Sequence, residues 1–327
     1  MKILLVKTSS LGDVVHNLPV VNDIRGAIGD AAIDWVVEKA FADIPGLHPG
    51  VRTVIPGELR RWRRSWFTAQ TRREWRAFVR ELRTEQYDAV IDTQGLLKSA
   101  LIAHAARGPR LGLDWRSSRE PLRLLYDRTF AVPWGLHAVE RNRRLCGLAL
   151  GYALQGEPDY GLRCVPSTAA WLPAAAFVVL LHATSHPSKL WPEARWIELG
   201  GRLAALGFGI VLPWGSEAER QRATRLADRL PGAVVPERLA LKDLAAVLAA
   251  SAGALGVDTG LTHLAAALGV PVVGIYGATD PQATGVHAKG PVLNVGAMNR
   301  FPSVEEVVEA FFHVGVAITA RSARQAT

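Results

Sequence analysis

Short apolar runs alternate with helical patterns along this chain, in two successive series. In the first half, apolar runs at residues 3–7, 32–37, 51–55 and 89–92 are separated by segments with helical periodicity. The second half repeats the alternation, with runs at 177–181, 209–212, 233–235, 254–257 and 271–277. Strands that alternate with helices form parallel sheets covered by helices on both faces. The sequence therefore predicts an α/β protein with two doubly wound, Rossmann-like sheets.

A proline-containing stretch separates the two series. Pro158, Pro166 and Pro173 fall within residues 156–173, and 327 residues are many for one hydrophobic core. We expect a first domain over 1–160 and a second over 161–327, with the last helix able to pack back on the first domain. A helix over 137–150 closes the first series, after a loop-rich stretch at 111–134.

Composition places the chain among folded proteins. Hydrophobic residues make up 49% and charged residues 21%, which excludes a disordered chain. The two cysteines, Cys146 and Cys164, lack metal-site spacing and fit a reducing compartment. No apolar run approaches the roughly 20 residues of a membrane span, so we expect a protein on the cytoplasmic side whose membrane contact is peripheral.

The positive charge is concentrated in one segment. Between Arg60 and Arg83, nine arginines accompany two glutamates, so this segment carries +7 of the net charge of +8. Trp62, Trp66 and Trp75 are interleaved with the arginines. This mixture predicts an anionic partner: a membrane surface, a nucleic acid or a phosphorylated substrate. A solvated basic helix face is the alternative.

The turn at residues 258–263 follows an apolar run and opens an alanine-rich helix. Asp258, Thr259, Gly260 and His263 stand where the strand becomes the helix, a position that suits phosphate binding. The same residue types also cap helices without binding any ligand.

A second loop in the same series has similar chemistry. Thr184, Ser185 and Lys189 follow the run at 177–181, and hydroxyls and an ammonium suit diphosphate oxygens. Because the carboxyl ends of parallel strands meet at one sheet edge, this loop and the Asp258 turn are predicted to share a ligand. Glu217 follows the run at 209–212 and either binds sugar hydroxyls there or only starts a helix.

The first apolar run leads into Ser10 and Asp13, which match the S-x-x-D helix-capping pattern. Dinucleotide and Walker fingerprints are absent, which argues against hydride transfer and P-loop phosphoryl transfer. The sequence also lacks a D-x-D pair and any cluster of histidines and carboxylates with metal spacing, so we expect no metal.

Several of these segments together resemble the bacterial lipopolysaccharide heptosyltransferases, above all those of type I. They occur in one order over nearly the full length, at residues 7–14, 60–64, 92–96, 119–121, 137–141, the Lys189 loop and 257–263. The resemblance implies a GT-B glycosyltransferase with two domains facing a central cleft. It implies inverting, metal-free and cofactor-free transfer of L-glycero-D-manno-heptose from ADP-heptose to the inner Kdo of Kdo2-lipid A.

The resemblance also implies roles for individual residues. Asp13 matches the family's proposed base, and Lys189 and helix N-termini would stabilise the diphosphate. The matching donor positions are Thr184, Ser185, Lys189, Glu217, Leu239, Asp258, Thr259, Gly260 and His263. Ser185 stands where the family has a second threonine, and Leu239 where familiar members have methionine. Both replacements keep the needed chemistry.

The arginine segment would then meet the acceptor and the inner leaflet of the inner membrane. The predicted acceptor residues are Arg60, Arg61, Arg63 and Arg64 of this segment, together with Arg119 and His137 from further along the chain. We expect a peripheral, monomeric enzyme with no nucleic-acid partner. The alternatives are a type II heptosyltransferase, another ADP-sugar transferase or, from a different class, a nucleic-acid-binding protein. The last would explain the arginines and tryptophans but not the two loops of the second series.

Overall fold

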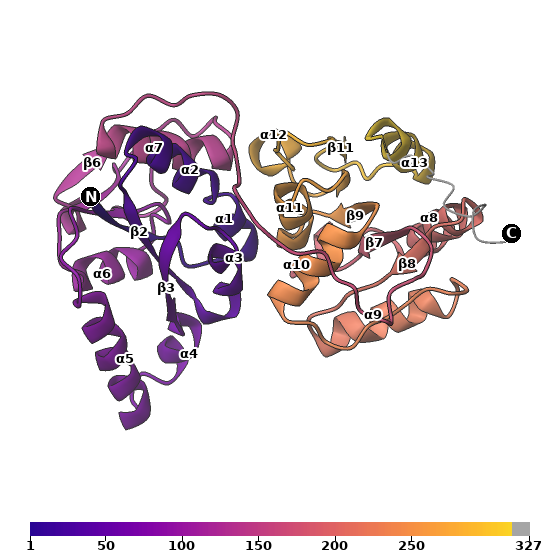
Figure 1. The fold of residues 1–327 in the computed structure, drawn as a ribbon, viewed down its shortest axis with the longest axis horizontal. Helices are drawn as coiled ribbons and strands as arrows, with labels where there is room; N and C mark the ends of the chain where they lie inside the picture. Colours follow the sequence, from indigo (N-terminus) through magenta and orange to yellow (C-terminus); the bar gives the residue numbers. More distant parts are fainter. Residues whose placement is uncertain (316–327) are drawn as a thin grey trace, which may run out of the picture. The chain divides into compact units, whose positions relative to one another are not determined.

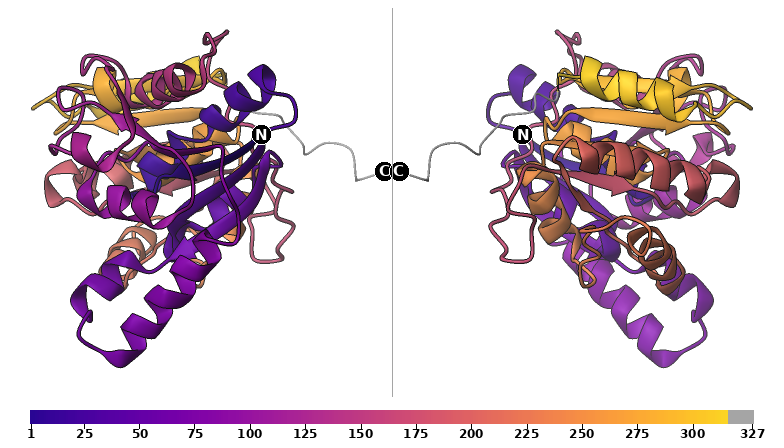
Figure 2. Two further views of the ribbon diagram at one scale, coloured as in Figure 1. Left: turned by 90° about the vertical axis from the view of Figure 1, so that its left-hand side faces the viewer. Right: turned by 90° about the vertical axis from the view of Figure 1, so that its right-hand side faces the viewer.

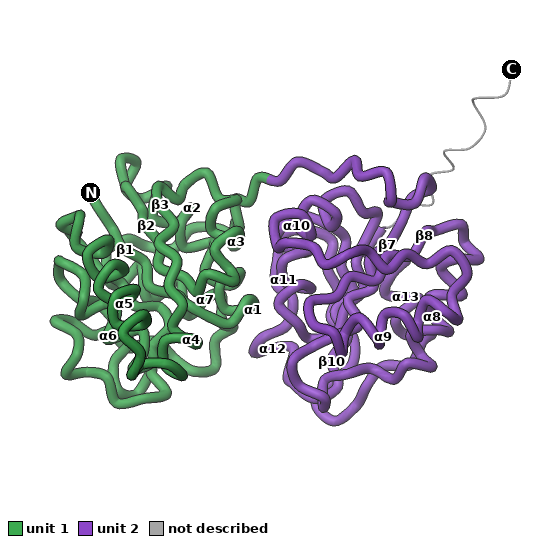
Figure 3. Tube along the Cα trace, turned by 90° about the horizontal axis from the view of Figure 1, so that it is seen from below, with its two compact units in different colours: residues 1–163 green, residues 164–327 purple. Residues whose placement is uncertain are grey.

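The computed structural model describes residues 1–315, and residues 316–327 lie outside the description. The chain divides into two compact units between Arg163 and Cys164 (Figure 3). Each unit is a parallel sheet with helices packed on it (Figure 1). The predicted α/β class with two Rossmann-like sheets is therefore confirmed.

The sheet of the first unit contains six parallel strands in the order β3-β2-β1-β4-β5-β6. The strands are β1 (Lys2–Val6), β2 (Ala32–Glu38), β3 (Val51–Gly57), β4 (Ala89–Asp92), β5 (Arg110–Leu113) and β6 (Arg128–Phe130). The direction in which successive strands are added reverses between β1 and β4. Ligands of doubly wound sheets bind at the carboxyl ends of the strands at such a reversal.

Helices cover both faces of this sheet. They are α1 (Leu11–Val15), α2 (Pro19–Ala27), α3 (Asp43–Gly46), α4 (Leu59–Arg64), α5 (Ala69–Leu82), α6 (Leu97–Ala105) and α7 (Ala138–Leu150), with short 3-10 turns at Lys39–Phe41 and Arg123–Leu125. Leu4 and Val6 of β1 pack in one core cluster with Trp62, Phe78 and Ile102, so α4, α5 and α6 share a face. Helices α4 and α5 form a hairpin that projects from the unit (Figure 2).

The expected loop at 111–134 was a wrong prediction, because it contains most of β5 and all of β6. These strands have only four and three residues, too few to show a periodic pattern. Gly112 in β5 is required by packing, since a Cβ there would lie 2.6 Å from the Tyr126 ring. The phenol of Tyr126 in turn donates to the buried Asp92 carboxylate at 2.7 Å.

The second unit has five parallel strands in the order β11-β10-β9-β7-β8. They are β7 (Phe177–Leu181), β8 (Gly209–Val211), β9 (Gly253–Val257), β10 (Val272–Tyr276) and β11 (Val292–Gly296). In this sheet, the direction in which successive strands are added reverses between β7 and β9. The predicted strand at 233–235 is reduced to a single parallel bridge between Val234 and Val211.

The helices of this unit are α8 (Glu193–Ala205), α9 (Glu217–Ala227), α10 (Leu241–Ala250), α11 (Gly260–Ala267), α12 (Pro281–Thr284) and α13 (Val304–His313), with a 3-10 turn at Pro187–Lys189. Residues of α8, α9 and α13 share one core cluster with β7, β9 and β10. Helices α10 and α11 contact each other and lie on the other face (Figure 1). The last described helix, α13, contacts α8, β10 and β11, so it belongs to the layers of its own unit.

Candidate active site

Two predicted ligand-binding residues meet at the reversal point of the second sheet. Lys189 follows β7 and Asp258 follows β9, strands that are neighbours in the sheet although β8 lies between them in sequence. The Lys189 ammonium lies 2.7 Å from Asp258 Oδ2. The predicted convergence of the two loops on one sheet edge is therefore observed.

Asp258 is the centre of this cluster. Thr279, which follows β10, donates to Oδ2 at 2.7 Å, and His263 Nε2 lies 3.7 Å from Oδ1. Burial favours a raised pKa for the Asp258 carboxyl, but hydrogen bonds from His263, Lys189 and Thr279 outweigh it and hold the pKa below its usual range. The carboxylate therefore stays ionised and holds the Lys189 ammonium at the sheet edge.

The sequence left open whether the residues before α11 cap this helix or bind a ligand. Thr259 occupies the N-cap position, but its side chain makes no capping hydrogen bond. Asp258 directs its carboxylate to Lys189 and Thr279, while Thr184 Oγ1 donates to the Asp258 carbonyl at 3.2 Å. Because neither residue before the helix caps it with a side chain, the N–H groups of its first turn suit an anionic ligand.

Three other predicted donor residues are exposed or only half-buried. Ser185 is exposed in the loop after β7. Glu217 opens α9 and forms an exposed ion pair with Arg220, with 3.1 Å between Oε2 and Nε, while Ser216 and Glu219 make the capping contacts of that helix. Leu239 is half-buried before α10. Ser185 follows β7 and Glu217 follows β8, while Leu239 follows the single bridge at Val234. The roles of all three residues stay predictions.

Asp13 lies at the reversal point of the first sheet, in the first turn of α1 after β1. Its Oδ2 accepts hydrogen bonds from Ser10 N at 2.7 Å and Ser10 Oγ at 2.9 Å, which leaves Oδ1 outside this capping contact. Gln94, after the neighbouring β4, accepts from the backbone N–H groups of Thr8 and Ser9 at 3.0 and 3.1 Å. The loop between β1 and α1 is thus held by Gln94 on one side and by Asp13 on the other.

Lys98 is a cation at this sheet edge that belongs to none of the motifs singled out in the sequence. It stands in the first turn of α6, after β4, and donates to Ser9 Oγ at 2.7 Å. Burial lowers its pKa, nearby Arg60 lowers it further, and the carboxylates of Glu38 and Asp13 act in the opposite direction. A half-buried ammonium next to arginines is a favourable partner for an anion. The signal that could have found Lys98 was its position soon after a strand, β4, and Thr279 follows β10 in the same way.

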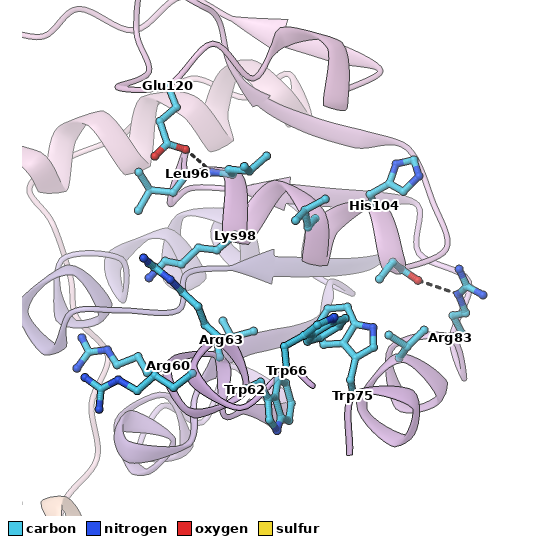
Figure 4. Close-up of a pocket in the computed structure, with 16 residues that line it drawn as sticks. Arg60, Trp62, Arg63, Trp66, Trp75, Arg83, Leu96, Lys98, His104 and Glu120 are labelled. Atoms are coloured by element: carbon cyan, nitrogen blue, oxygen red, sulfur yellow. Dashed lines mark hydrogen bonds between the residues drawn. The ribbon is translucent and has the colours of Figure 1, made fainter. Parts of the chain in front are cut away.

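The arginines of α4 separate into two groups. Arg61 forms ion pairs with Glu58 and Glu74. Arg60, Arg63 and Arg64 instead line a cavity of about 1250 Å³, together with Lys98 of α6 (Figure 4). A helix places successive residues about 100° apart, so neighbours in sequence face different surroundings. Three of the four predicted acceptor arginines of this run therefore line the same cavity.

The remaining predicted acceptor residues lie elsewhere in the first unit. Arg119 is exposed in the loop after β5. His137 is the N-cap of α7, where Nδ1 accepts from Val139 N at 3.2 Å, and its ring centroid lies 5.5 Å from that of His16. These contacts account for the position of His137, and the predicted binding roles of both residues stay predictions.

Two wider features bear on cofactors and membranes. Among residues 1–315, no group of three or more histidine, cysteine, aspartate or glutamate side chains is arranged to hold a metal ion. In the same part of the chain, every helix is too short or too polar to cross a membrane.

A family model for glycosyltransferase family 9, the heptosyltransferases, matches residues 75–308. The lipopolysaccharide heptosyltransferase 1 of Pseudomonas aeruginosa is 48% identical over 295 residues, which cover 89% of this chain and 83% of that protein. The chain belongs to glycosyltransferase family 9. It is therefore an enzyme, and the resemblance found in its sequence is confirmed.

Solved structures of family members agree with this assignment. The Escherichia coli heptosyltransferase WaaC with ADP has a TM-score of 0.88 and 41% identity, and the match covers 96% of this chain and all of that one. The two Rossmann-like units therefore form the GT-B architecture of this glycosyltransferase. Lipopolysaccharide heptosyltransferase 2 of E. coli is only 26% identical, over 87% of this chain and 85% of that protein. The similarity thus favours type 1 over type 2.

Proposed function

We propose that this glycosyltransferase moves L-glycero-D-manno-heptose from ADP-heptose to the inner Kdo of Kdo2-lipid A, with inversion and without a metal. The observation that carries the proposal is the Lys189–Asp258 pair at the switch point of the second sheet, beside the uncapped first turn of α11. The ADP bound to the E. coli relative supports a nucleotide diphosphate as the ligand of such a site.

On the donor side, Lys189 and α11 supply positive charge to the diphosphate. The ammonium is a charge-assisted donor, and the first-turn N–H groups add the positive end of the helix dipole. When ADP leaves, the negative charge on its terminal phosphate grows, and these fixed groups stabilise it without reorganising. Asp258 and Thr259 are then available to orient sugar and phosphate oxygens.

On the acceptor side, we propose Asp13 as the general base. The Kdo hydroxyl oxygen bonds to the anomeric carbon of heptose from the face opposite the diphosphate. The bond from that carbon to the diphosphate oxygen breaks, and its electron pair leaves with ADP. The hydroxyl proton passes to the Asp13 carboxylate, whose Ser10 contacts fix its orientation.

The cationic cavity supports an acidic acceptor near a membrane surface. Arg60, Arg63 and Lys98 lie close together at one end of it (Figure 4) and match the carboxylates and phosphates of Kdo2-lipid A. Trp66 is 44% exposed and Phe67 is 91% exposed at the connection between α4 and α5. Exposed aromatic rings among arginines favour an anionic lipid interface, so we propose peripheral binding to the cytoplasmic face of the inner membrane.

Incubation with ADP-heptose and Kdo2-lipid A in the presence of EDTA tests the overall reaction. We expect ADP release together with a mass gain of one heptose on the acceptor, at the same rate as with added Mg²⁺. A rate that collapses with EDTA and returns with Mg²⁺ would contradict metal independence. Transfer only to an acceptor that already carries heptose would instead identify a type 2 activity.

Charge reversal at Arg63 tests the acceptor site. Arg63→Glu should raise the KM for Kdo2-lipid A by about tenfold or more, because one charge-assisted contact is replaced by repulsion. ADP-heptose affinity, measured by titration calorimetry, should stay unchanged. Arg76→Glu is the matched control, since Arg76 is exposed on α5 but does not line the cavity. Equal effects of both variants would point to general surface charge rather than to a site.

A further inference from the structure

The cavity of the first unit has a chemistry that a sugar acceptor alone does not explain. Nine of the sixteen described residues that line it are apolar. They come from two distant parts of the sequence, the α4–α5 hairpin and α6 with the residue before it. Its volume of about 1250 Å³ exceeds the roughly 300–1,000 Å³ of ordinary small-molecule pockets. The space therefore suits a larger, partly apolar ligand.

Most cations of the cavity are separated from its tryptophans. Figure 4 shows Arg60, Arg63 and Lys98 gathered at one end and the tryptophans further along, followed at the far side by Arg83 and His104. The Arg83 guanidinium there is engaged, because its Nε donates to the Ala105 carbonyl at 2.9 Å. The single carboxylate of the lining, Glu120, is already engaged, because it accepts a hydrogen bond from Leu97 N at 2.5 Å. An anionic headgroup attached to a hydrocarbon chain is complementary to such an arrangement.

Apolar side chains also reach solvent along the α6 wall of the cavity. Leu97 is 52% exposed and Leu101 is 50% exposed, although both line the cavity. Exposed leucines in a hollow mark a surface that binds an apolar partner. We propose that the cavity holds one acyl chain of the lipid acceptor, beside the cations that bind its acidic headgroup. This inference rests on the proposed function.

An acyl chain fits this role better than a second apolar protein surface. A chain that moves from a bilayer into apolar walls exchanges one apolar environment for another, so it binds without being exposed to water. The resulting small net change in free energy allows the product to leave again. The group of Arg60, Arg63 and Lys98 then fixes the headgroup, and the chain among the tryptophans and leucines fixes the orientation of the acceptor.

The test compares two acceptors with one pair of variants. Leu101→Asp places a carboxylate on the apolar wall, and Leu148→Asp on α7 is the matched control, because Leu148 is also helical and 50% exposed but does not line the cavity. We expect Leu101→Asp to lower kcat/KM at least tenfold for acylated Kdo2-lipid A in mixed micelles. For the fully deacylated, water-soluble acceptor its kcat/KM should stay within twofold, and Leu148→Asp should change neither.

A binding measurement separates this inference from the transfer reaction. Trp62, Trp66 and Trp75 line the cavity, so 11-bromoundecanoate bound there should quench tryptophan fluorescence in the wild type and far less in Leu101→Asp. Leu97→Asp should behave in the same way, and aspartate is well tolerated in the first turn of a helix. These experiments do not require heptose transfer.

The possible outcomes are distinct. Equal loss of activity on both acceptors, or equal quenching in the wild type and both cavity variants, overturns the acyl-chain site. Failure of the wild type to transfer heptose to either acceptor overturns the proposed function, while the quenching result still decides whether the cavity takes a chain.

Discussion

Replacement of Asp13 by Asn lowers kcat for heptose transfer by about 10² or more, while the affinity for ADP-heptose stays the same. The amide cannot accept the hydroxyl proton, and this function is needed only in the transition state. The side chain keeps its size and its contact with Ser10, so the local structure should persist. Steady-state kinetics with donor and acceptor varied separately measure the effect.

Asp30→Asn is the control for Asp13. It removes an exposed carboxylate from the same unit, and its kcat should match the wild type. Near-normal turnover of Asp13→Asn would assign the base to another group.

Lys189→Ala has the second large effect, on both binding and turnover. Loss of the ammonium should raise the Kd for ADP-heptose by about tenfold and lower kcat/KM by about 10². The diphosphate loses a charged partner in the bound state, and it loses more when negative charge develops on departing ADP. Calorimetric titration with ADP-heptose and initial-rate assays give the two numbers.

Two comparisons separate this effect from a structural one. Asp258 keeps its contacts with Thr279 and His263 when Lys189 is removed, so the melting curve should remain cooperative. Lys242→Ala removes an exposed ammonium from α10 of the same unit and should leave the donor Kd unchanged. If donor affinity and rate were both normal in Lys189→Ala, Lys189 would lie outside the site.

The pairing of Lys189 with Asp258 could be predicted because it depends on topology. Both residues follow apolar strands of one alternating series, and the ends of parallel strands share a sheet edge. Thr279 follows β10 at that same edge, yet a lone threonine gives no motif. Its contact with Asp258 depends on a side-chain direction that sequence spacing does not specify.

Other features required the folded chain. The strands β5 and β6 are too short for a periodic signal, and β5 contains a glycine that the Tyr126 ring demands. The arginine run looks uniform in sequence, but its members have different surroundings on α4. Arg61 forms ion pairs with glutamates, whereas Arg63 lines the cavity. Lys98 joins that cavity from a helix more than thirty residues further along the chain.

By itself, the sequence determined the α/β class, the two parallel sheets and the sheet edges on which Asp13, Lys189 and Asp258 lie. These properties follow from hydrophobic periodicity and strand order, which are local or topological. Only the tertiary structure decided that the turn at Asp258 holds an ion pair instead of capping α11, and that cations and tryptophans enclose one cavity. Such outcomes depend on competing hydrogen bonds and on burial, which act between side chains far apart in sequence.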